Sequence, residues 1–263
     1  MRVSLIITTY NWKEALALSL KSALHQKELP LEIVVADDGS RSDTGELIRR
    51  MGQEAPIPVI HSWQEDKGFR LARSRNRAIA MARGDYIILI DGDIILESHF
   101  VQDHCKFAKP GYFVQGTRVL LGKRLSRQIL QEQRLIGSFC IRGVKNRKNC
   151  LRSNLLSRIF SLRNTRLRGI KTCNFAFWRQ DAIAINGFNE EFVGWGREDS
   201  EFTARLINHG IRRQNVKFNA LAYHLYHPMN DRTRLDANDA ILHRTIAERA
   251  TTCRRGISQY LAE

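Results

Sequence analysis

The sequence contains no apolar run of the roughly 18 residues that a membrane-spanning helix needs. Its opening stretch, MRVSLIITTY, is only briefly apolar and lacks the small-residue cleavage site of a signal peptide. We therefore expect a cytoplasmic protein that is at most peripherally associated with the inner face of the cell membrane.

Cysteine is scarce as well. The five cysteines are an odd number without a CxxC pair, which argues against a disulfide framework or a zinc site and favours reduced, structural thiols. A hydrophobic content of 43% in 263 residues is ordinary for a globular chain. Disorder is therefore not expected, and the length suits one large α/β domain or two small ones.

Acidic residues are nearly absent from one segment, residues 118–171. This segment holds fifteen lysines and arginines but only one acid, Glu132, and so carries almost all of the formal net charge of +15. Basic blocks of this kind bind phosphate, whether on nucleic acid, anionic lipid or a phosphorylated glycan.

Apolar runs alternate with helix-periodic stretches in the first part of the chain. Strands are predicted at VSLIITTY, LEIVVADDGS, IPVIHSW and DYIILIDGD, and helices at KEALALSLKSALHQ, DTGELIRRMG (with Asp43 as a cap) and ARSRNRAIAMA. This alternation predicts an α/β fold with a mostly parallel sheet covered by helices on both faces.

The later part of the chain is less regular. CNFAFWRQDAIAINGF reads as ordered core, REDSEFTARLINHG as a helix that ends at Gly210, and ALAYHLYHP as a strand that ends before Pro228. The last thirty or so residues are polar and rich in arginine, and are predicted to form one helix with a loose end.

Two aspartates, Asp91 and Asp93, follow the apolar run YIILI with only Gly92 between them. Carboxylates in a half-buried place repel each other, so the pair favours a bound Mg²⁺ or Mn²⁺ with substrate phosphates as further ligands. The glycine would let a diphosphate approach the backbone closely. The tripeptide alone also fits a simple turn after a strand.

Other polar residues follow or precede the same strands. Tyr10 ends the first strand, where its ring is suited to stacking on a base, and Asp38 follows the second, where it could accept a hydrogen bond from a base or ribose. Ligands gather at the carboxyl ends of parallel strands, so these residues are expected at one site. Basic residues before the DGD strand are available to a phosphate: Lys67, Arg70, Arg73 and Arg75.

The motifs TTYNWKEAL, EIVVADDGSRSD, GFRLARSRNRAI and YIILIDGDIIL stand in the order found in family 2 glycosyltransferases of the GT-A fold, which the chain resembles. The later stretch GFNEEFVGWGREDSEFTARL resembles the carboxyl-terminal motif of β-galactosyltransferases and bacterial chondroitin-type polymerases. The basic segment between them has no counterpart in this resemblance.

The resemblance implies an inverting transfer of a hexose or N-acetylhexosamine from a UDP-sugar to a hydroxyl of a bacterial cell-surface glycan or glycolipid, such as lipopolysaccharide or capsule. A single GT-A domain with a basic insert is then expected. It would comprise a nucleotide-sugar-binding half (1–117), a basic amphipathic insert (118–171), an acceptor and catalytic half (172–230) and a C-terminal helical tail (231–263).

For the donor, the resemblance implies that Asp91 lies near the ribose and a metal-bound water. The donor-binding residues are then expected to be Thr8, Tyr10, Asp38, Lys67, Arg75 and Asp91.

For the metal, the resemblance implies Asp93 as a direct ligand, with Asp91 beside it. His224, His227 or both would supply imidazole, and imidazole favours Mn²⁺ over Mg²⁺. The alternative is a pair of surface histidines at a strand end.

For the acceptor, an unactivated hydroxyl is a poor nucleophile near neutral pH, so a base must take its proton. The GWGREDSE context implies Asp199 as that catalytic base and Glu198 as the group that orients the acceptor. Trp195 would offer a flat face to a sugar ring beside Gly196. Without that context, the two acids would read as the first turn of a helix.

Within the basic insert, Leu151, Leu155, Ile159 and Leu162 share one side of a helical wheel, flanked by Arg152, Arg158 and Arg163. We favour an amphipathic element that meets an anionic membrane surface. The alternatives are a wall that recognises a phosphorylated acceptor, or a solvated loop. Nucleic acid is not expected as a partner, because no aromatic-interleaved or zinc-bearing module is present.

Two rival functions remain at this level. One is a phosphatase of the haloacid dehalogenase type, with Asp91 as nucleophile and Asp93 as the second aspartate of its motif. However, the DGD strand comes fourth rather than first, and DGDII lacks a clear Thr or Val two positions after the second aspartate. The other is a basic membrane- or nucleic-acid-binding protein whose carboxylates are structural.

Overall fold

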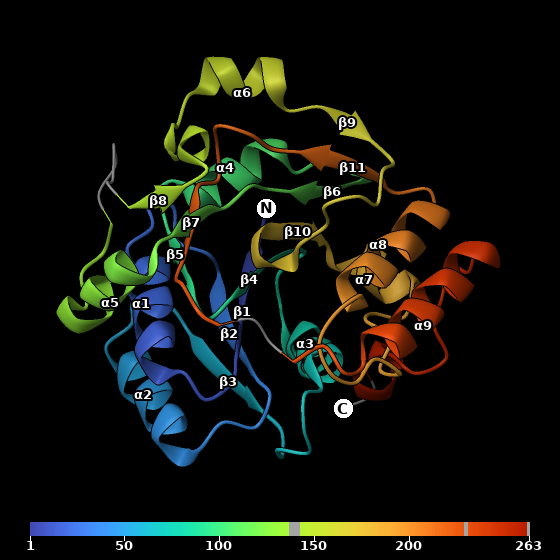
Figure 1. The fold of residues 1–263 in the computed structure, drawn as a ribbon, viewed down its shortest axis with the longest axis horizontal. Coiled ribbons are helices and arrows are strands. Elements are labelled where there is room, and N and C mark those ends of the chain that lie inside the picture. Colours follow the sequence, from blue (N-terminus) through green and yellow to red (C-terminus); the bar gives the residue numbers. More distant parts are fainter. Residues whose placement is uncertain (137–142, 229–230, 262–263) are drawn as a thin grey trace.

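The computed structural model describes residues 1–136, 143–228 and 231–261. Its main feature is an eight-stranded sheet in the order β3-β2-β1-β4-β10-β6-β11-β9 (Figure 1). Neighbours are parallel from β3 to β4 and between β6 and β11, whereas β10 and β9 run antiparallel to their neighbours. The strands are β1 (Val3–Thr9), β2 (Glu32–Asp37), β3 (Val59–Trp63), β4 (Tyr86–Asp91), β6 (Tyr112–Gln115), β9 (Arg163–Asn164), β10 (Phe175–Trp178) and β11 (Arg212–Asn215).

A second sheet consists of four short strands in the order β5-β12-β7-β8. Its strands are β5 (Ile94–Leu96), β12 (Ala222–His224), β7 (Val119–Leu121) and β8 (Val144–Lys145). Because β5 follows β4 after a two-residue turn, this small sheet is attached directly to the end of the central strand of the large one.

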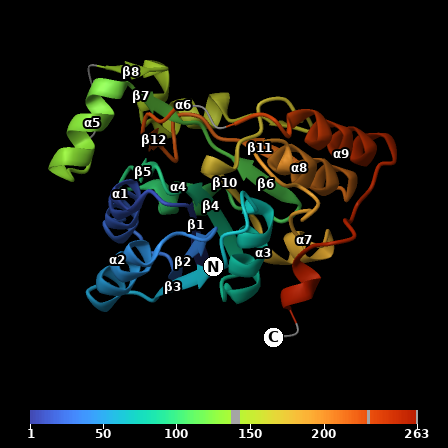
Figure 2. The ribbon, with the colours of Figure 1, turned by 60° about the horizontal axis from the view of Figure 1, so that its bottom comes forward.

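Helices cover both faces of the large sheet (Figure 2). In β1, Leu5 and Ile7 pack in the cluster that contains α1 and α2, whereas Ile6 packs in the cluster that contains α3 and α8. Alternate burial on two faces explains why the strand has no alternation of apolar and polar residues. The α-helices are α1 (Lys13–Leu24), α2 (Ser42–Gln53), α3 (Leu71–Met81), α4 (Phe100–Phe107), α5 (Lys123–Glu132), α6 (Asn154–Phe160), α7 (Arg179–Ala184), α8 (Glu198–Asn208) and α9 (Leu235–Ala247); the short 3₁₀-helices are η1 (Arg147–Cys150), η2 (Thr172–Asn174) and η3 (Ile257–Tyr260).

The predicted fold class, a mostly parallel α/β sheet with helices on both faces, is confirmed. Gly210 also lies just beyond the end of α8, with a φ of +94° that suits glycine. The predicted cap Asp43 is wrong, because Arg41 precedes α2 and Asp43 instead pairs with Lys13 at 2.7 Å.

The predicted loose end of the C-terminal helix is also wrong. The helix α9 ends at Ala247, and the chain returns to the core through η3, where Ile257 is fully buried in the cluster beneath α3. The backbone N–H of Ile257 donates to the carbonyl of Asn186 at 3.0 Å. Apolar burial and this hydrogen bond therefore anchor the tail.

The basic segment 118–171 contributes to both sheets, through β7 and β8 in the small sheet and β9 at the edge of the large one. The cysteines that the structure describes, Cys105, Cys150, Cys173 and Cys253, are free thiols, as predicted, whereas Cys140 lies outside the described residues. No helix in the described part of the chain is long and apolar enough to cross a membrane.

Candidate active site

The candidate site lies at the carboxyl end of β4, where Asp91 ends the strand and Asp93 leads into β5. The backbone N–H of Gly92 donates to the carbonyl of Thr8 at 2.6 Å. A Cβ atom at Gly92 would lie 2.9 Å from that same oxygen, so no side chain fits there. The glycine between the two aspartates is thus required by close packing against β1.

Asp91 is held by groups of the chain itself. The Thr8 hydroxyl donates to Asp91 Oδ1 at 2.9 Å, and Arg75 Nη2 lies 3.3 Å from the same oxygen. Arg75 Nη1 lies 3.3 Å from Glu198 Oε1, which makes Arg75 a bridge between the two carboxylates. This arginine is only 1% exposed, and its guanidinium lies 5.2 Å from the ring centre of Phe188. We call Asp91, Arg75 and Glu198 the arginine bridge.

Glu198 and Asp199 begin α8, directly after the GWG turn. Gly194 and Gly196 have φ values of +79° and +107°, a backbone conformation that glycine adopts without strain. Burial, together with the charge of Asp199, raises the pKa of Glu198 to about 7, and its Oε2 has no hydrogen-bond partner among the described residues. Burial also raises the pKa of Asp199, which accepts a hydrogen bond from the Ser200 N–H at 2.6 Å.

Asp93 has different neighbours. Its Oδ2 lies 3.5 Å from His224 Nε2 and 3.3 Å from His227 Nε2, and one potential ligand atom from each of the three residues lies within 4.8 Å of the others. We call these three residues the Asp–His cluster. Strand pairing brings them together, because His224 of β12 is paired with Ile94, the residue after Asp93.

The electrostatics of the Asp–His cluster suit a cation. Burial and the charge of Asp91 raise the pKa of Asp93 to about 8, and its Oδ1 is a buried oxygen without a partner in the described chain. Burial and the nearby Arg118 lower the pKa of His224 to about 4, which keeps the imidazole in the neutral form that binds metals. One carboxylate and two imidazoles form a donor set that fits a divalent cation such as Mn²⁺.

The predicted donor-binding residues lie at different distances from solvent. Asp38 is buried, and accepts hydrogen bonds from Gln64 Nε2 at 2.5 Å and from the Arg70 N–H at 2.8 Å. Burial raises its pKa to about 6. Tyr10 exposes its ring and donates its hydroxyl hydrogen bond to Asp66 at 2.9 Å.

The predicted phosphate-binding cations also differ in how far their side chains are exposed to solvent. Lys67 is exposed and pairs with Glu65 at 2.8 Å rather than with a carboxylate of the two clusters. Arg75 lies at the centre of the site, but its guanidinium faces Asp91 and Glu198 rather than solvent. Its observed contacts therefore favour a role in holding carboxylates.

Around the predicted acceptor residues, the Trp195 ring is partly exposed, and the guanidinium of Arg232 lies 5.1 Å from its centre. The carbonyl oxygen of Gly196 accepts a hydrogen bond from Asn238 Nδ2 at 3.0 Å. The GWG turn is therefore fastened to α9, which places the tryptophan beside the first residues of α8.

Two residues at the site were not predicted. Arg118 is close enough to lower the pKa of His224, and its Nη1 lies 3.4 Å from the Cys173 sulfur. In the sequence it was only the first residue of the basic segment, and pairing of β7 with β12 brings it here. Trp12 meets the His227 ring edge-on, with centroids 6.3 Å apart, and its place in TTYNWKEAL was the one available signal.

A mostly parallel α/β sheet with a carboxylate pair and a potential cation site at the end of its central strand defines the GT-A class. The sequence matches the family model "Glycosyl transferase family 2" over residues 4–174, and the chain belongs to this family. A second model, "N-terminal domain of galactosyltransferase", matches residues 157–228, which include the GWG turn. The predicted family is thus confirmed.

Curated relatives include polysaccharide synthases. Chondroitin synthase of Escherichia coli is 28% identical over 84% of the chain and 34% of its own length, and hyaluronan synthase of Pasteurella multocida is 26% identical over 84% and 24%. Validoxylamine A glucosyltransferase of Streptomyces hygroscopicus subsp. limoneus is 28% identical over 80% and 48%. The chain spans between a quarter and a half of the length of these relatives.

Among solved structures, S. aureus TarS 1–349 in complex with UDP-GlcNAc matches the whole chain and 71% of its own, with a TM-score of 0.63 and 20% identity. This likeness confirms the fold. Together, the family membership and these relatives indicate a transferase rather than the phosphatase or non-catalytic binding protein considered as rivals.

Proposed function

We propose that the chain transfers a hexose or N-acetylhexosamine from a UDP-sugar to a hydroxyl of a cell-surface glycan or glycolipid, with inversion and with the help of a divalent cation. The observation that carries this proposal is that two clusters with different chemistry flank one strand end: the Asp–His cluster and the arginine bridge that leads to Asp199. A UDP-sugar donor is supported by a relative from Escherichia coli whose name specifies UDP-Glc as the donor of a glucosyltransferase, and by TarS bound to UDP-GlcNAc. The chondroitin and hyaluronan synthases support a glycan product.

On the donor side, Asp93, His224 and His227 would hold the cation. A bound divalent cation, for which the imidazoles favour Mn²⁺, supplies compensation for negative charge on a leaving diphosphate. Tyr10 presents an exposed ring for base stacking, and Thr8 fixes the orientation of Asp91 toward the ribose. These residues act by binding and orienting the donor.

On the acceptor side, Asp199 would take the hydroxyl proton. The acceptor oxygen bonds to the anomeric carbon, the bond from that carbon to the diphosphate oxygen breaks, and the proton passes to the Asp199 carboxylate. Burial raises the pKa of Asp199, and a higher pKa makes its carboxylate a stronger base. Arg75 holds Glu198 next to Asp199, where Glu198 orients the acceptor. Trp195 offers a ring face to the sugar.

The test is a panel of UDP-sugars, measured by thermal shift and by UDP release with Mn²⁺ or with EDTA. A donor present at 100 times its Kd should stabilise the native protein by about 2.7 kcal/mol. We expect one UDP-sugar to raise Tm with Mn²⁺ and to lose this effect with EDTA. If no UDP-sugar raises Tm or releases UDP in either condition, the proposal is wrong.

We also propose that the basic segment holds the enzyme at an anionic membrane surface, which would bring it to a lipid-linked acceptor. The basic excess and the exposed side chains Leu155, Ile159 and Leu162 support this. The name of one relative, a glucosyltransferase of Escherichia coli, specifies a diphosphoundecaprenol-linked acceptor.

A further inference from the structure

Helix α6 buries a polar residue and exposes apolar ones, which is the opposite of an ordinary surface helix. Its buried residue is Ser157, which is 2% exposed, whereas Leu155 and Ile159 are 68% and 58% exposed. Just beyond the helix, Leu162 is 65% exposed. A surface helix normally turns its apolar stripe to the core, so this arrangement leaves apolar area available to a partner. We call Leu155, Ile159 and Leu162 the apolar stripe.

A basic cavity of about 620 Å³ lies beside the apolar stripe, between the end of α4 and the strands β9 and β11. Leu162 belongs to both features. None of the side chains that line the cavity is acidic. They are Lys106, Phe107, Ala108, Lys109, Arg158, Ser161, Leu162, Arg163 and Gln214.

The cationic side chains of the cavity differ in whether another residue of the protein already pairs with them. Lys106 pairs with Asp103 at 3.0 Å, and Arg163 donates from Nε to Gln214 Oε1 at 2.8 Å. Within the described parts of the chain, Lys109 and Arg158 form no ion pair with an acidic side chain, and Lys109 lies 5.6 Å from the ring centre of Tyr112. Two exposed cations therefore retain charge for an outside anion.

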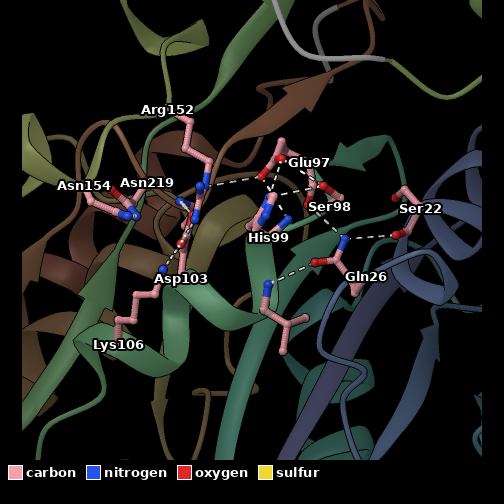
Figure 3. A network of polar contacts seen from close by, with 12 residues as sticks. Ser22, Gln26, Glu97, Ser98, His99, Asp103, Lys106, Arg152, Asn154 and Asn219 are labelled. Atoms are coloured by element: carbon pink, nitrogen blue, oxygen red, sulfur yellow. Dashed lines mark hydrogen bonds and ion pairs between the residues drawn. The ribbon is translucent and has the colours of Figure 1, made fainter.

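Arg152, which the sequence placed beside the apolar stripe, is not one of them. It turns inward and donates to both oxygens of Asp103, at 2.9 and 2.7 Å (Figure 3). It also lies 3.7 Å from Glu97. The expectation that Arg152 flanks the exposed stripe is wrong, because a buried carboxylate on α4 captures its guanidinium.

We propose that the basic cavity binds the phosphate headgroup of an anionic phospholipid while the apolar stripe enters the lipid boundary. This inference rests on the proposed membrane association and specifies its contact. Guanidinium and ammonium groups are the usual phosphate partners in proteins. A lipid surface matches better than a soluble polyanion, because only a lipid offers acyl chains next to the phosphate for Leu155 and Ile159 to contact.

The headgroup site is separate from the candidate active site. The strand β11, which is the cavity-lining strand nearer to β4, lies three strands from β4 in the sheet order, and strands are spaced about 4.8 Å apart, so the cavity lies roughly 14 Å or more to the side of β4. The helix α6, where the lipid contact would be made, lies at the periphery of the fold (Figure 1). Variants of the cavity can therefore be made without touching proposed catalytic groups.

The test compares two double variants that each remove two positive charges. Lys109→Gln with Arg158→Gln alters the cavity, and Arg124→Gln with Arg127→Gln alters exposed positions on α5, which lies away from α6 in Figures 1 and 2. Binding is measured by co-sedimentation with vesicles of phosphatidylcholine, with or without phosphatidylglycerol. Since a basic residue near an anionic surface is worth about fivefold in affinity, the cavity pair should weaken binding roughly 25-fold and the α5 pair by no more than about twofold.

Several results would overturn the headgroup site. Equal weakening by both pairs would mean that charge acts without a specific cavity, and equal binding of the wild type to both vesicle types would mean that phosphate charge is irrelevant. Inorganic phosphate that raises Tm through Lys109 and Arg158, without vesicle binding, would indicate a free-phosphate site. Dextran sulfate binding that depends on the cavity, with vesicle binding that does not, would indicate a soluble polyanion.

A second variant tests the apolar half of the proposal. Leu155→Ser with Ile159→Ser changes exposed side chains, so folding should be retained. We expect this variant to bind anionic vesicles more weakly than the wild type at both low and high salt, because salt screens charges but not the lost apolar contact. Unchanged binding would contradict insertion of the stripe. The Tm shift with UDP and Mn²⁺ is measured on every variant and should match the wild type, which separates failure of the headgroup site from failure of the proposed transfer.

Discussion

Asp91 and Asp93 are separated by one glycine, yet the protein treats their charges in different ways. Asp91 is 34% exposed and receives a guanidinium and a hydroxyl from Arg75 and Thr8. Asp93 is 13% exposed, faces two histidines, and keeps one buried oxygen without a described partner. The chain thus compensates the first carboxylate itself, whereas the second would gain its compensation from the proposed cation.

This difference assigns separate tasks to the two sides of one strand end. The arginine bridge is a closed unit that ties Asp91 to Glu198 and so to the start of α8. The Asp–His cluster is an open unit, in which burial and the charge of Asp91 disfavour ionised Asp93, as expected for a carboxylate that would be compensated by the proposed cation. Substitutions on the two sides should therefore have different effects on binding, transfer and stability.

The largest effect is expected from Asp93→Asn. The change removes the one anionic ligand of the Asp–His cluster, so Mn²⁺-dependent UDP binding should disappear and transfer should fall by about 10³-fold or more. Isothermal titration with UDP, with and without Mn²⁺, and UDP release measure the two losses. The matched comparison is Asp91→Asn, which alters the proposed ribose contact but no member of the Asp–His cluster, so UDP binding should weaken yet keep its dependence on Mn²⁺. Loss of that dependence in both variants would mean that the two carboxylates act as one site.

The next effect concerns Asp199, on the side of the arginine bridge. Asp199→Asn removes the proposed base but no ligand of the cation, so transfer should fall by at least about 10²-fold while UDP binding with Mn²⁺ stays intact. Single-turnover transfer and titration with UDP measure the two quantities. Near-normal transfer would show that another group takes the proton.

The sequence predicted structure well where the residues of a segment are compatible with only one environment. The runs VSLIITT and YIILID are mostly apolar and almost wholly buried, and they became β1 and β4 as predicted. The DGD tripeptide after such a run also fitted a simple turn, so its proposed place in a site depended on the other motifs. The order of the motifs then predicted the family, which the family match confirmed.

Contacts between distant segments could not be predicted in this way. Whether His224 or His227 approaches Asp93 depends on the pairing of β12 with β5, and the structure brings both. The helical wheel of α6 showed an apolar stripe but not the side on which it would lie. Likewise, Arg75 read as a free cation, because only the packing of α3 under α8 reveals the two carboxylates that it joins.

A smaller effect on activity, but a measurable one on stability, is expected from Arg75→Met. Removing the shared partner leaves Asp91 and Glu198 without the cation that joins them, which should lower the free energy of unfolding by about 3 kcal/mol near neutral pH. Urea denaturation measures the change. Arg49→Met on the exposed surface of α2 is the control and should change stability by less than about 0.5 kcal/mol. A loss of that small size in Arg75→Met would mean that the bridge contributes little to the fold.

The smallest effect is a pH dependence on the same side. Burial raises the pKa of Glu198 to about 7, above its ordinary value, so its contribution to stability is complete below the unfolded pKa and is lost as pH rises through 7. Glu198→Gln resembles the protonated form at every pH. The stability of the variant relative to wild type should therefore improve by about 2 kcal/mol between pH 5 and pH 8, measured without metal by urea denaturation. Titration of Asp93 occurs in both proteins and cancels in the difference. If the difference in stability does not change with pH, Arg75 compensates the charge of Glu198 as fully as it compensates the charge of Asp91.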